Sequence, residues 1–210
     1  KATLSSSISA TKNFGYESPE TTHYSVVDQW GNAVSVTTTI NLGYGNGCIV
    51  DGAGFFLNNE MDDFSSKPGV PNAFGLVGNE ANAIEPEKRP LSSMTPTIVL
   101  KNDKPFLIIG SPGGSTIITT TMQTILNVID HNMDIKEAVC SARFHSQWLP
   151  NVIQFEPNSL TKDVRINLES KGHKLFPRSG FIGEANGILI TEDGFYGGGD
   201  CRGQTSAIGY

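Results

Sequence analysis

Two continuous apolar runs separated by four polar residues constrain the fold of this chain more than any other feature. The runs are T-P-T-I-V-L, ending at Leu100, and P-F-L-I-I-G, beginning at Pro105, with K-N-D-K between them. Their β-branched residues predict a pair of strands, and the lack of polar alternation predicts that both strand faces are covered. Strands covered on both faces need a layer of structure on each side. We therefore expect a layered architecture.

Helical patterns supply candidates for one of these layers. Asp134 is placed to cap a short helix that follows it. Residues 161–172 carry an amphipathic pattern that predicts a further helix ending at Gly172. After Ser115, apolar residues largely follow a 3.6-residue period and predict one long packed helix; they are Ile117, Ile118, Met122, Ile125, Leu126 and Ile129.

Hairpin patterns occur near both ends of the chain. From Thr21, apolar positions on either side of Q-W-G-N at residues 29–32 predict one hairpin, and I-L-I-T, E-D-G, F-Y-G predicts another near the C-terminus. Residues 1–20 are rich in Ser, Thr, Asn and Gly and have no period, so we expect a linker or surface loop. The order of strands, helices and strands predicts an α/β sandwich without a repeat or a second domain boundary.

Charge and hydropathy restrict the possible partners. The formal net charge is −6 and no basic run occurs, which argues against a nucleic-acid partner. No stretch approaches the roughly 18 apolar residues of a membrane span. The first residues lack the apolar core of a signal peptide. Any targeting information is therefore expected upstream of this chain.

The residues that commonly bind metals are scattered. Cys48, Cys140 and Cys201 form an odd, sparse set without C-x-x-C spacing, which indicates neither a disulfide framework nor a zinc site, so we interpret them as incidental thiols. The four histidines have no second-ligand spacing either; they are His23, His131, His145 and His173. We expect no metal and no cofactor.

Thr21 has two possible interpretations from the residues alone. Threonine directly before a strand-like run is explained by its β-propensity. If the bond between Glu20 and Thr21 is cut, however, the new N-terminus carries a hydroxyl nucleophile and an α-amine with a pKa near 8 that can take its proton. Cleavage would make this segment an active site.

Two other segments also have more than one interpretation from the residues alone. G-S-P-G-G-S lacks the lysine of a P-loop and the spacing of a G-x-S-x-G elbow. Gly113 and Gly114 precede the expected long helix, so we predict that their N–H groups face a developing oxyanion and act in catalysis, although a turn leading into a helix is compatible with the same geometry. The acidic pair Asp62 and Asp63 is compatible with a metal site or with a solvated turn.

Six motifs follow one another along the chain. They are T-T-H-Y-S-V-V-D, N-N-E-M-D-D-F, K-P-G-V-P-N, R-P-L-S-S-M, G-S-P-G-G-S and R-F-H-S-Q-W-L-P. In this order they resemble the small subunit of the γ-glutamyltranspeptidase family. The resemblance implies an N-terminal-nucleophile (Ntn) hydrolase αββα sandwich, of which this chain is the C-terminal half and a large subunit the rest. It also implies a precursor cut between Glu20 and Thr21, so that residues 1–20 are the large-subunit tail and 21–210 the small-subunit catalytic domain.

The resemblance also implies roles for particular residues. Thr21 is the expected nucleophile and Thr39 a second threonine that assists it, although T-T-T at 37–39 also suits a strand. Phe74, in the expected lid loop from Lys67, stands where many relatives have a tyrosine. Asn41, Glu60 and Asp63 match the positions that bind the substrate α-amino group, and Ser92 and Ser93 those that bind its α-carboxylate, although two serines also suit a turn or helix cap.

The expected activity follows from the resemblance. The chain would cleave the γ-glutamyl amide of glutathione and its conjugates through a γ-glutamyl-threonine ester, passing the group to water, amino acids or peptides. The expected partner is the large subunit, and the expected compartment is periplasmic, extracellular or membrane-associated. A related amidohydrolase acting on poly-γ-glutamate or acyl amides, or an inactive unprocessed fragment, are the alternatives; Asn41, Asp63, Ser92 and Ser93 favour the γ-glutamyl pocket.

Overall fold

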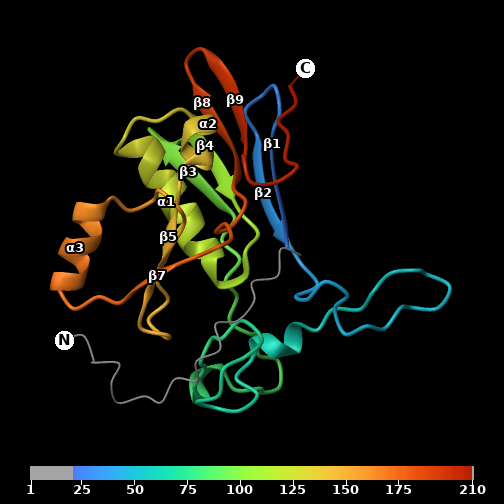
Figure 1. The fold of residues 1–210 in the computed structure, drawn as a ribbon. Coiled ribbons are helices and arrows are strands. Elements are labelled where there is room, and N and C mark those ends of the chain that lie inside the picture. The colour runs from blue at the N-terminus through green and yellow to red at the C-terminus, as the bar shows by residue number, and fades with distance from the viewer. Residues whose placement is uncertain (1–20, 210) are drawn as a thin grey trace.

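The computed structural model describes residues 21–209, so the expected linker and Glu20 lie outside the described residues. An antiparallel four-stranded sheet with the strand order β3-β4-β8-β9 forms the centre of the fold (Figure 1). The bounds of its strands are Thr97–Lys101 for β3, Lys104–Gly110 for β4, Asn186–Thr191 for β8 and Gly194–Gly199 for β9. Both expected hairpins of this sheet, β3–β4 and β8–β9, are confirmed.

The hairpin of β1 (Thr22–Val27) and β2 (Ala33–Thr38) packs on one face of this sheet, against β4 and β8. Helices α1 (Ile117–Ile129) and α2 (Ile135–Cys140) pack on the other face (Figure 1). Successive side chains of a strand point to opposite faces, and β4 follows this rule. Its Leu107 and Ile109 belong to the core shared with the helices, whereas Gly110 meets the hairpin.

This stacking gives three of the four layers of the αββα sandwich: helices, sheet and hairpin. Helix α2 begins with the expected Asp134 cap, which forms a capping box with Glu137. Its buried residues Ile135, Ala138 and Val139 join the core. No described helix covers the outer face of the hairpin, where Tyr24 and Val26 are exposed.

The predicted packing face of α1 is only partly right. Ile117 is buried, but Ile118, Met122, Leu126 and Ile129 are 41–50% exposed. Threonines take their place against the protein interior: Thr120, Thr121 and Thr124 are buried. Thr124 Oγ1 donates to the Thr120 carbonyl at 3.0 Å, whereas the hydroxyls of Thr120 and Thr121 have no hydrogen-bond partner among the described residues. The period therefore predicted the helix correctly and its buried face incorrectly.

The prediction that both faces of the β3–β4 strand pair are covered holds for β4 and fails for β3. Residues Leu107 to Gly110 of β4 are fully buried between helices and hairpin. In the edge strand β3, however, Ile98 and Leu100 are exposed. A continuous apolar run does not distinguish a central strand from an edge strand whose outer side lacks a cover among the described residues.

A second, small sheet escaped prediction because its strands are only two or three residues long. Its order is β5-β6-β7, with β6 antiparallel to β5 and parallel to β7. Helix α3 (Lys162–Ser170) connects β6 to β7 and is followed by Gly172 at a φ of 88°, which confirms the expected helix and its glycine. The strands are Phe144–His145 for β5, Ile153–Phe155 for β6 and Leu175–Pro177 for β7.

The interpretation of the cysteines as incidental thiols is wrong for two of the three. Cys140, at the end of α2, forms a disulfide with Cys201, just after β9; the Cα atoms are 5.3 Å apart and the residues are separated by 61 positions. The two cysteines meet only because α2 packs against β9, so no local spacing in the sequence indicated the disulfide. Cys48 is a free, exposed thiol.

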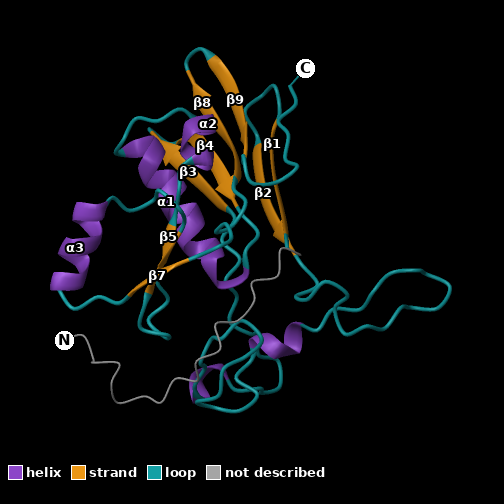
Figure 2. Cartoon of the chain, in the orientation of Figure 1, coloured by secondary structure: helices purple, strands orange, loops and turns teal. Residues whose placement is uncertain are grey.

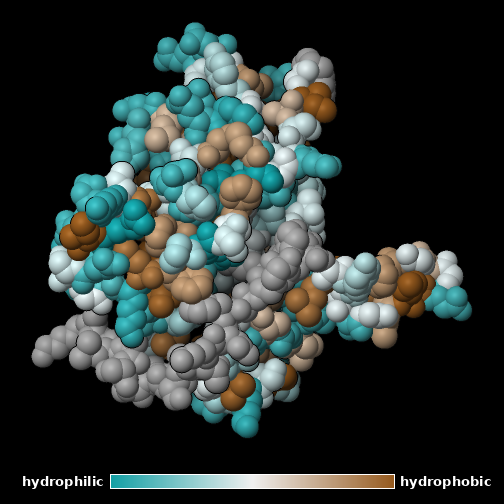
Figure 3. All heavy atoms as spheres, in the orientation of Figure 1, coloured by the Kyte–Doolittle hydropathy of each residue, from teal (hydrophilic) through white to brown (hydrophobic). Residues whose placement is uncertain are grey.

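Between β2 and β3 the chain forms loops and two short 3₁₀ turns, η2 (Glu60–Asp63) and η3 (Glu80–Asn82) (Figure 2). Part of this region projects away from the body and carries hydrophobic residues on its surface (Figure 1 and Figure 3). The side chains of Ile49 and Phe55 are exposed in this region. Within residues 21–209, no helix has the length and apolarity needed to cross a bilayer.

Candidate active site

A cavity of about 240 Å³ opens where the loop region meets the end of the sandwich at which β1 begins and β2 ends. Nine of the predicted site residues line it. Gly113 adjoins the cavity through its neighbour Gly114 without lining it, and Glu20 lies outside the described residues. The nine are Thr21, Thr39, Asn41, Glu60, Asp63, Phe74, Ser92, Ser93 and Gly114.

The hairpin holds the two threonines opposite each other. Thr22 pairs with Thr38 in the β1–β2 register, so the next residues outward on the two strands are Thr21 and Thr39. Thr21 is buried. Thr39 Oγ1 accepts a hydrogen bond from the Asn41 backbone N–H at 2.9 Å, which leaves the Thr39 hydroxyl hydrogen for a donor role.

His23, which the sequence analysis did not single out, fixes this hairpin on the sheet. Its buried ring places Nδ1 2.8 Å from Thr37 Oγ1 and Nε2 3.1 Å from Ser25 Oγ. Burial lowers the pKa of His23 to about 4, so the ring is neutral at neutral pH. The ring also fills the space where a side chain at Gly110 would lie. The only signal in the sequence was a histidine within the predicted β1 run; the glycine that it covers lies on another strand.

Two carboxyl groups from η2 share one side of the cavity. Burial, the charge of Asp63 and a hydrogen bond with it raise the pKa of Glu60 to about 7. The pKa of Asp63 is raised as well, chiefly by burial and also by the charge of Asp62. Glu60 Oε1 is buried and has no hydrogen-bond partner among the described residues. Such a pair favours an entering cation that satisfies both groups.

Polar groups complete the cavity next to this pair. Asn41 is buried at a φ of 74°, and its Nδ2 donates to the Asn59 carbonyl at 3.2 Å. Ser92 Oγ accepts from the Met94 N–H at 3.1 Å, which is the expected turn. That bond uses the oxygen and leaves the hydroxyl hydrogen to donate to a ligand, so the turn and the binding role are compatible.

The glycine turn has conformations that other residues rarely adopt. Gly113 has a φ of 132° and Gly114 a φ of 53°. A Cβ on Gly113 would lie 3.1 Å from the Gly183 Cα, and one on Gly114 would lie 3.0 Å from the Phe74 ring. The 3₁₀ turn η4 (Gly114–Thr116) leads from here directly into α1, so the N–H groups lie at the positive end of a helix.

The loop from Lys67 covers the cavity and is ordered by Asn72, a residue that the sequence analysis missed. Asn72 Oδ1 accepts from the Phe74 and Leu76 N–H groups, each at 3.0 Å. Asp62 Oδ2 accepts from the Ala73 N–H at 3.2 Å and thus ties the loop to η2. The turn interpretation therefore applies to Asp62, and both Asp62 and Asp63 line the cavity. In P-N-A-F-G, an asparagine two residues before the aromatic ring was the available signal.

No three His, Cys, Asp or Glu side chains converge as metal ligands within the described part of the chain. The groups that do converge on the cavity are hydroxyls, carboxyls, an amide and backbone N–H groups. A buried threonine directly before a strand, in such a cavity and on this stack of layers, is the arrangement of the Ntn hydrolases.

Comparison with known proteins specifies the family. The sequence model of the family described as gamma-glutamyltranspeptidase matches residues 2–210. The chain belongs to this family. It is 50% identical over 203 residues to the glutathione hydrolase proenzyme of Escherichia coli strain K12, an alignment that covers 96% of this chain and 35% of that protein. The chain therefore spans about a third of the length of this relative.

Solved structures agree in fold. A mutant Helicobacter pylori γ-glutamyltranspeptidase superposes with a TM-score of 0.82 at 58% identity, over 87% of this chain and 100% of that chain. The Bacillus anthracis transpeptidase CapD superposes with a TM-score of 0.68 at 25% identity, over 90% and 99% of the two chains. The expected Ntn-hydrolase fold is therefore confirmed.

Proposed function

We propose that this chain is the catalytic part of an enzyme that transfers or hydrolyses γ-glutamyl groups, with Thr21 as its nucleophile. The observation that carries the proposal is the convergence of Thr21 with the Glu60–Asp63 pair on one small cavity. A hydroxyl nucleophile beside a cation-binding acid pair suits an amide substrate that also carries an ammonium group.

Maturation precedes catalysis in this proposal. Cleavage of the bond between Glu20 and Thr21 frees the Thr21 α-amine, whose pKa near 8 lets it act as a base at neutral to mildly alkaline pH. The sequence places Glu20 directly before Thr21, and the E. coli relative is named a proenzyme. Both observations support a precursor that becomes active by cutting itself.

The chemical steps then follow from the site. Thr21 Oγ attacks the γ-carbonyl carbon of the substrate while its proton passes to the α-amine. The oxyanion that forms receives hydrogen bonds from the glycine turn of Gly113 and Gly114, and the Thr39 hydroxyl assists the nucleophile. The carbon–nitrogen bond breaks as the α-ammonium returns the proton to the leaving amine. Water or an acceptor amine then attacks the resulting ester and frees Thr21.

The cavity walls select the substrate class. Glu60, Asp63 and Asn41 bind the α-ammonium group, and the hydroxyls of Ser92 and Ser93 donate to the α-carboxylate. An α-amino acid held in this way presents its side-chain amide to the nucleophile. Glutathione and its S-conjugates are γ-glutamyl amides of this class.

A large subunit from the same precursor is the proposed partner. The chain covers only 35% of the length of its E. coli relative, and α1 exposes the apolar residues Ile118, Met122 and Leu126. We also propose an extracytoplasmic location, in the periplasm, outside the cell or at the membrane surface. The disulfide between Cys140 and Cys201 supports it, because disulfides persist in oxidising compartments.

The experiment that tests the proposal uses the full precursor. The wild type, Thr21→Ala and the neighbouring control Thr22→Ala are purified, and the small product is identified by its mass and N-terminal sequence. Each is then assayed against a γ-glutamyl anilide with and without an acceptor dipeptide. Thr22 suits as the control because it is exposed on β1.

We expect wild type and Thr22→Ala to give a product that begins at Thr21 and to release the aniline. Thr21→Ala should remain uncut and inactive. A product beginning elsewhere, or an active Thr21→Ala protein, would refute the mechanism. Aniline release that no acceptor dipeptide alters would favour the alternative of a pure amidohydrolase.

A further inference from the structure

Behind the active site lies a buried cluster of two ion-paired arginines and two acids. Arg143 donates to Asp200 Oδ2 at 2.6 Å, and Arg202 donates to Asp200 Oδ1 at 2.8 Å and to Glu156 Oε2 at 2.6 Å. Arg143, Asp200 and Glu156 are almost fully buried. None of the four lines the cavity, so substrate binding does not account for them.

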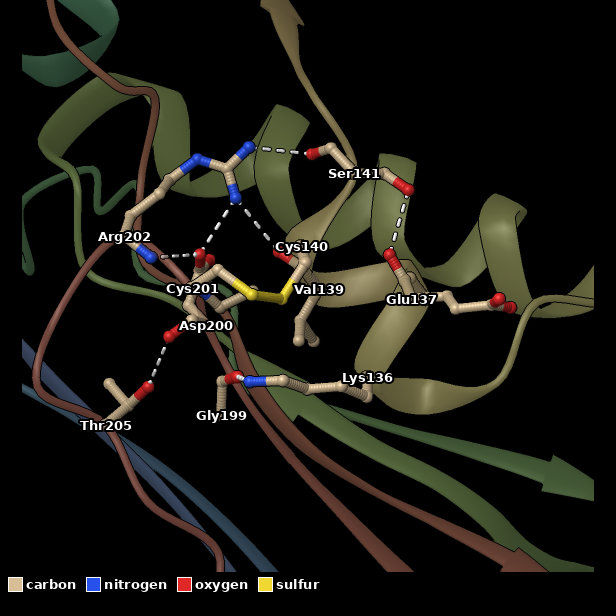
Figure 4. Close-up of a disulfide and its surroundings, with 12 residues drawn as sticks. Lys136, Glu137, Val139, Cys140, Ser141, Gly199, Asp200, Cys201, Arg202 and Thr205 are labelled. Carbon is tan, nitrogen blue, oxygen red and sulfur yellow. Dashed lines mark hydrogen bonds and ion pairs between the residues drawn. A yellow bond between two sulfur atoms is a disulfide. The ribbon is translucent and has the colours of Figure 1, made fainter.

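The disulfide is built into this cluster (Figure 4). Cys201 stands between Asp200 and Arg202 in the sequence. Around its partner Cys140, Arg202 donates to the carbonyls of both neighbours, to Val139 at 3.1 Å and to Ser141 at 2.7 Å. The bond thus joins the end of α2 to the segment that supplies two members of the cluster.

The acids of the cluster hold both ends of the segment 182–185. The Ile182 N–H donates to Glu156 Oε1 at 2.6 Å, and the Ala185 N–H donates to Asp200 Oδ2 at 2.7 Å. Arg143 also donates to the Ile182 carbonyl at 2.7 Å. Ile182 and Ala185 are fully buried, so the position of this segment depends on the cluster.

The middle of the segment supports the glycine turn of the active site. The Glu184 N–H donates to Ser111 Oγ at 2.9 Å. Gly183 lies next to Gly113, since a Cβ added to Gly113 would lie 3.1 Å from the Gly183 Cα. A continuous chain of contacts therefore runs from the disulfide through Asp200 and the segment 182–185 to the turn that faces the oxyanion.

The two sulfur atoms differ in their surroundings. Cys201 is exposed, whereas Cys140 is half-buried. The guanidinium of Arg202 bridges the carbonyls on both sides of Cys140, and a nearby cation favours a thiolate. The exposed Cys201 is therefore the expected point of attack by an incoming thiolate, with Cys140 as the leaving group.

We propose that the Cys140–Cys201 disulfide is an exchange site for low-molecular-weight thiols, and that its opening lowers turnover by releasing the support of the glycine turn. A thiolate attacks Cys201 Sγ, the bond to Cys140 Sγ breaks, and Cys140 leaves as a thiolate that takes a proton. A second thiol then attacks the mixed disulfide, which gives free Cys201 and the oxidised form of the small thiol. Both cysteines act as positioning residues.

The inference rests on the proposed function in one respect, since turnover is its readout. Glutathione, the proposed substrate, itself carries a thiol of the required class. High concentrations of such thiols would thus slow the enzyme through a site outside the cavity, separately from competition for the Glu60–Asp63 pair.

The test uses the full-length processed enzyme and 2-mercaptoethanol, a thiol without a γ-glutamyl group. Alkylation of free thiols followed by peptide mass spectrometry counts the opened disulfide, and a γ-glutamyl anilide reports kcat and KM. The double variant Cys140→Ser/Cys201→Ser mimics the opened state, and Cys48→Ser controls for the third cysteine of this chain. Removal of the thiol and reoxidation show whether any change is reversible.

We expect two new alkylated cysteines, a fall of kcat by about 5-fold and a KM within about 2-fold of the oxidised enzyme. Reoxidation should restore kcat. The double variant should have the kcat of the reduced enzyme and should not respond to the thiol, and Cys48→Ser should respond as wild type does. No alkylation at Cys140 and Cys201 would overturn the exchange site, and an unchanged kcat after full opening would overturn its effect on turnover. An oxidised enzyme without any activity would contradict the proposed function instead.

Discussion

Replacing Glu60 by glutamine should stabilise the ligand-free protein, and the gain should depend on pH. Glutamine keeps the size and the hydrogen-bonding capacity of the side chain but has no proton to lose. In the wild type, burial and the charge of Asp63 raise the pKa of Glu60 from 4.5 to about 7. The empty site therefore destabilises the folded protein whenever Glu60 is ionised.

The sign follows from proton linkage. Below pH 4.5 the Glu60 carboxyl is protonated in the folded and the unfolded chain. Between pH 4.5 and about 7 the folded chain holds more protons, so its stability falls as the pH rises through this window. The full shift corresponds to at most about 3 kcal/mol. Because the Glu60 side chain still reaches the solvent of the cavity, screening reduces this to about 1 kcal/mol.

Thermal unfolding of the full-length, ligand-free protein between pH 5 and pH 8 measures this effect. Glu60→Gln should unfold roughly 2 °C above wild type at pH 8, and most of the difference should vanish at pH 5. Glu192→Gln, in the exposed β8–β9 turn, is the matched control and should show no such trend. A difference that is constant with pH, or that grows toward pH 5, would refute the shared acid pair.

Three further substitutions test separate parts of the site and fold. Gly113→Ala forces a Cβ toward Gly183 at a φ of 132° and should lower kcat about 100-fold, whereas Gly54→Ala, which meets open space at a φ of 73°, should leave it unchanged; equal kcat values would argue against the oxyanion role. Phe74→Tyr adds a hydroxyl to the loop that covers the cavity; if this hydroxyl helps to close the cavity, as the family resemblance implies, the ratio of transfer to hydrolysis should rise in an acceptor assay, and an unaltered ratio would exclude a role of the hydroxyl in closure. The double variant Cys140→Ser/Cys201→Ser removes the cross-link between residues that are 61 positions apart and should lower the free energy of unfolding in urea by up to about 4 kcal/mol. A loss no larger than that of a cysteine-to-serine substitution at an exposed position would show that the disulfide adds no stability.

The features that could be predicted from the sequence are those specified locally. The β1–β2 hairpin, the capping box of Asp134 and the glycine after α3 each depend on a few adjacent residues. The site residues were found through motifs in one chain order, and the structure gathers nine of them around one cavity. Their catalytic and binding roles stay predictions.

The features that could not be predicted depend on contacts between distant segments. Cys140 and Cys201 meet only because α2 packs on β9. The buried face of α1 carries three threonines, which an apolar period does not detect. His23 acts through the space above Gly110 on another strand. To predict any of these three features, one must know which helices and strands pack against one another.

Peptide-resolved mass spectrometry of the acyl-enzyme tests the role of Thr21 most directly. The processed enzyme is mixed with a γ-glutamyl anilide, quenched in acid during turnover and digested. We expect a γ-glutamyl adduct on the hydroxyl of Thr21 in the peptide that begins with this residue, and no adduct in Thr21→Ala. An adduct on Thr22, Thr39 or any other side chain, or turnover with none at Thr21, would contradict it.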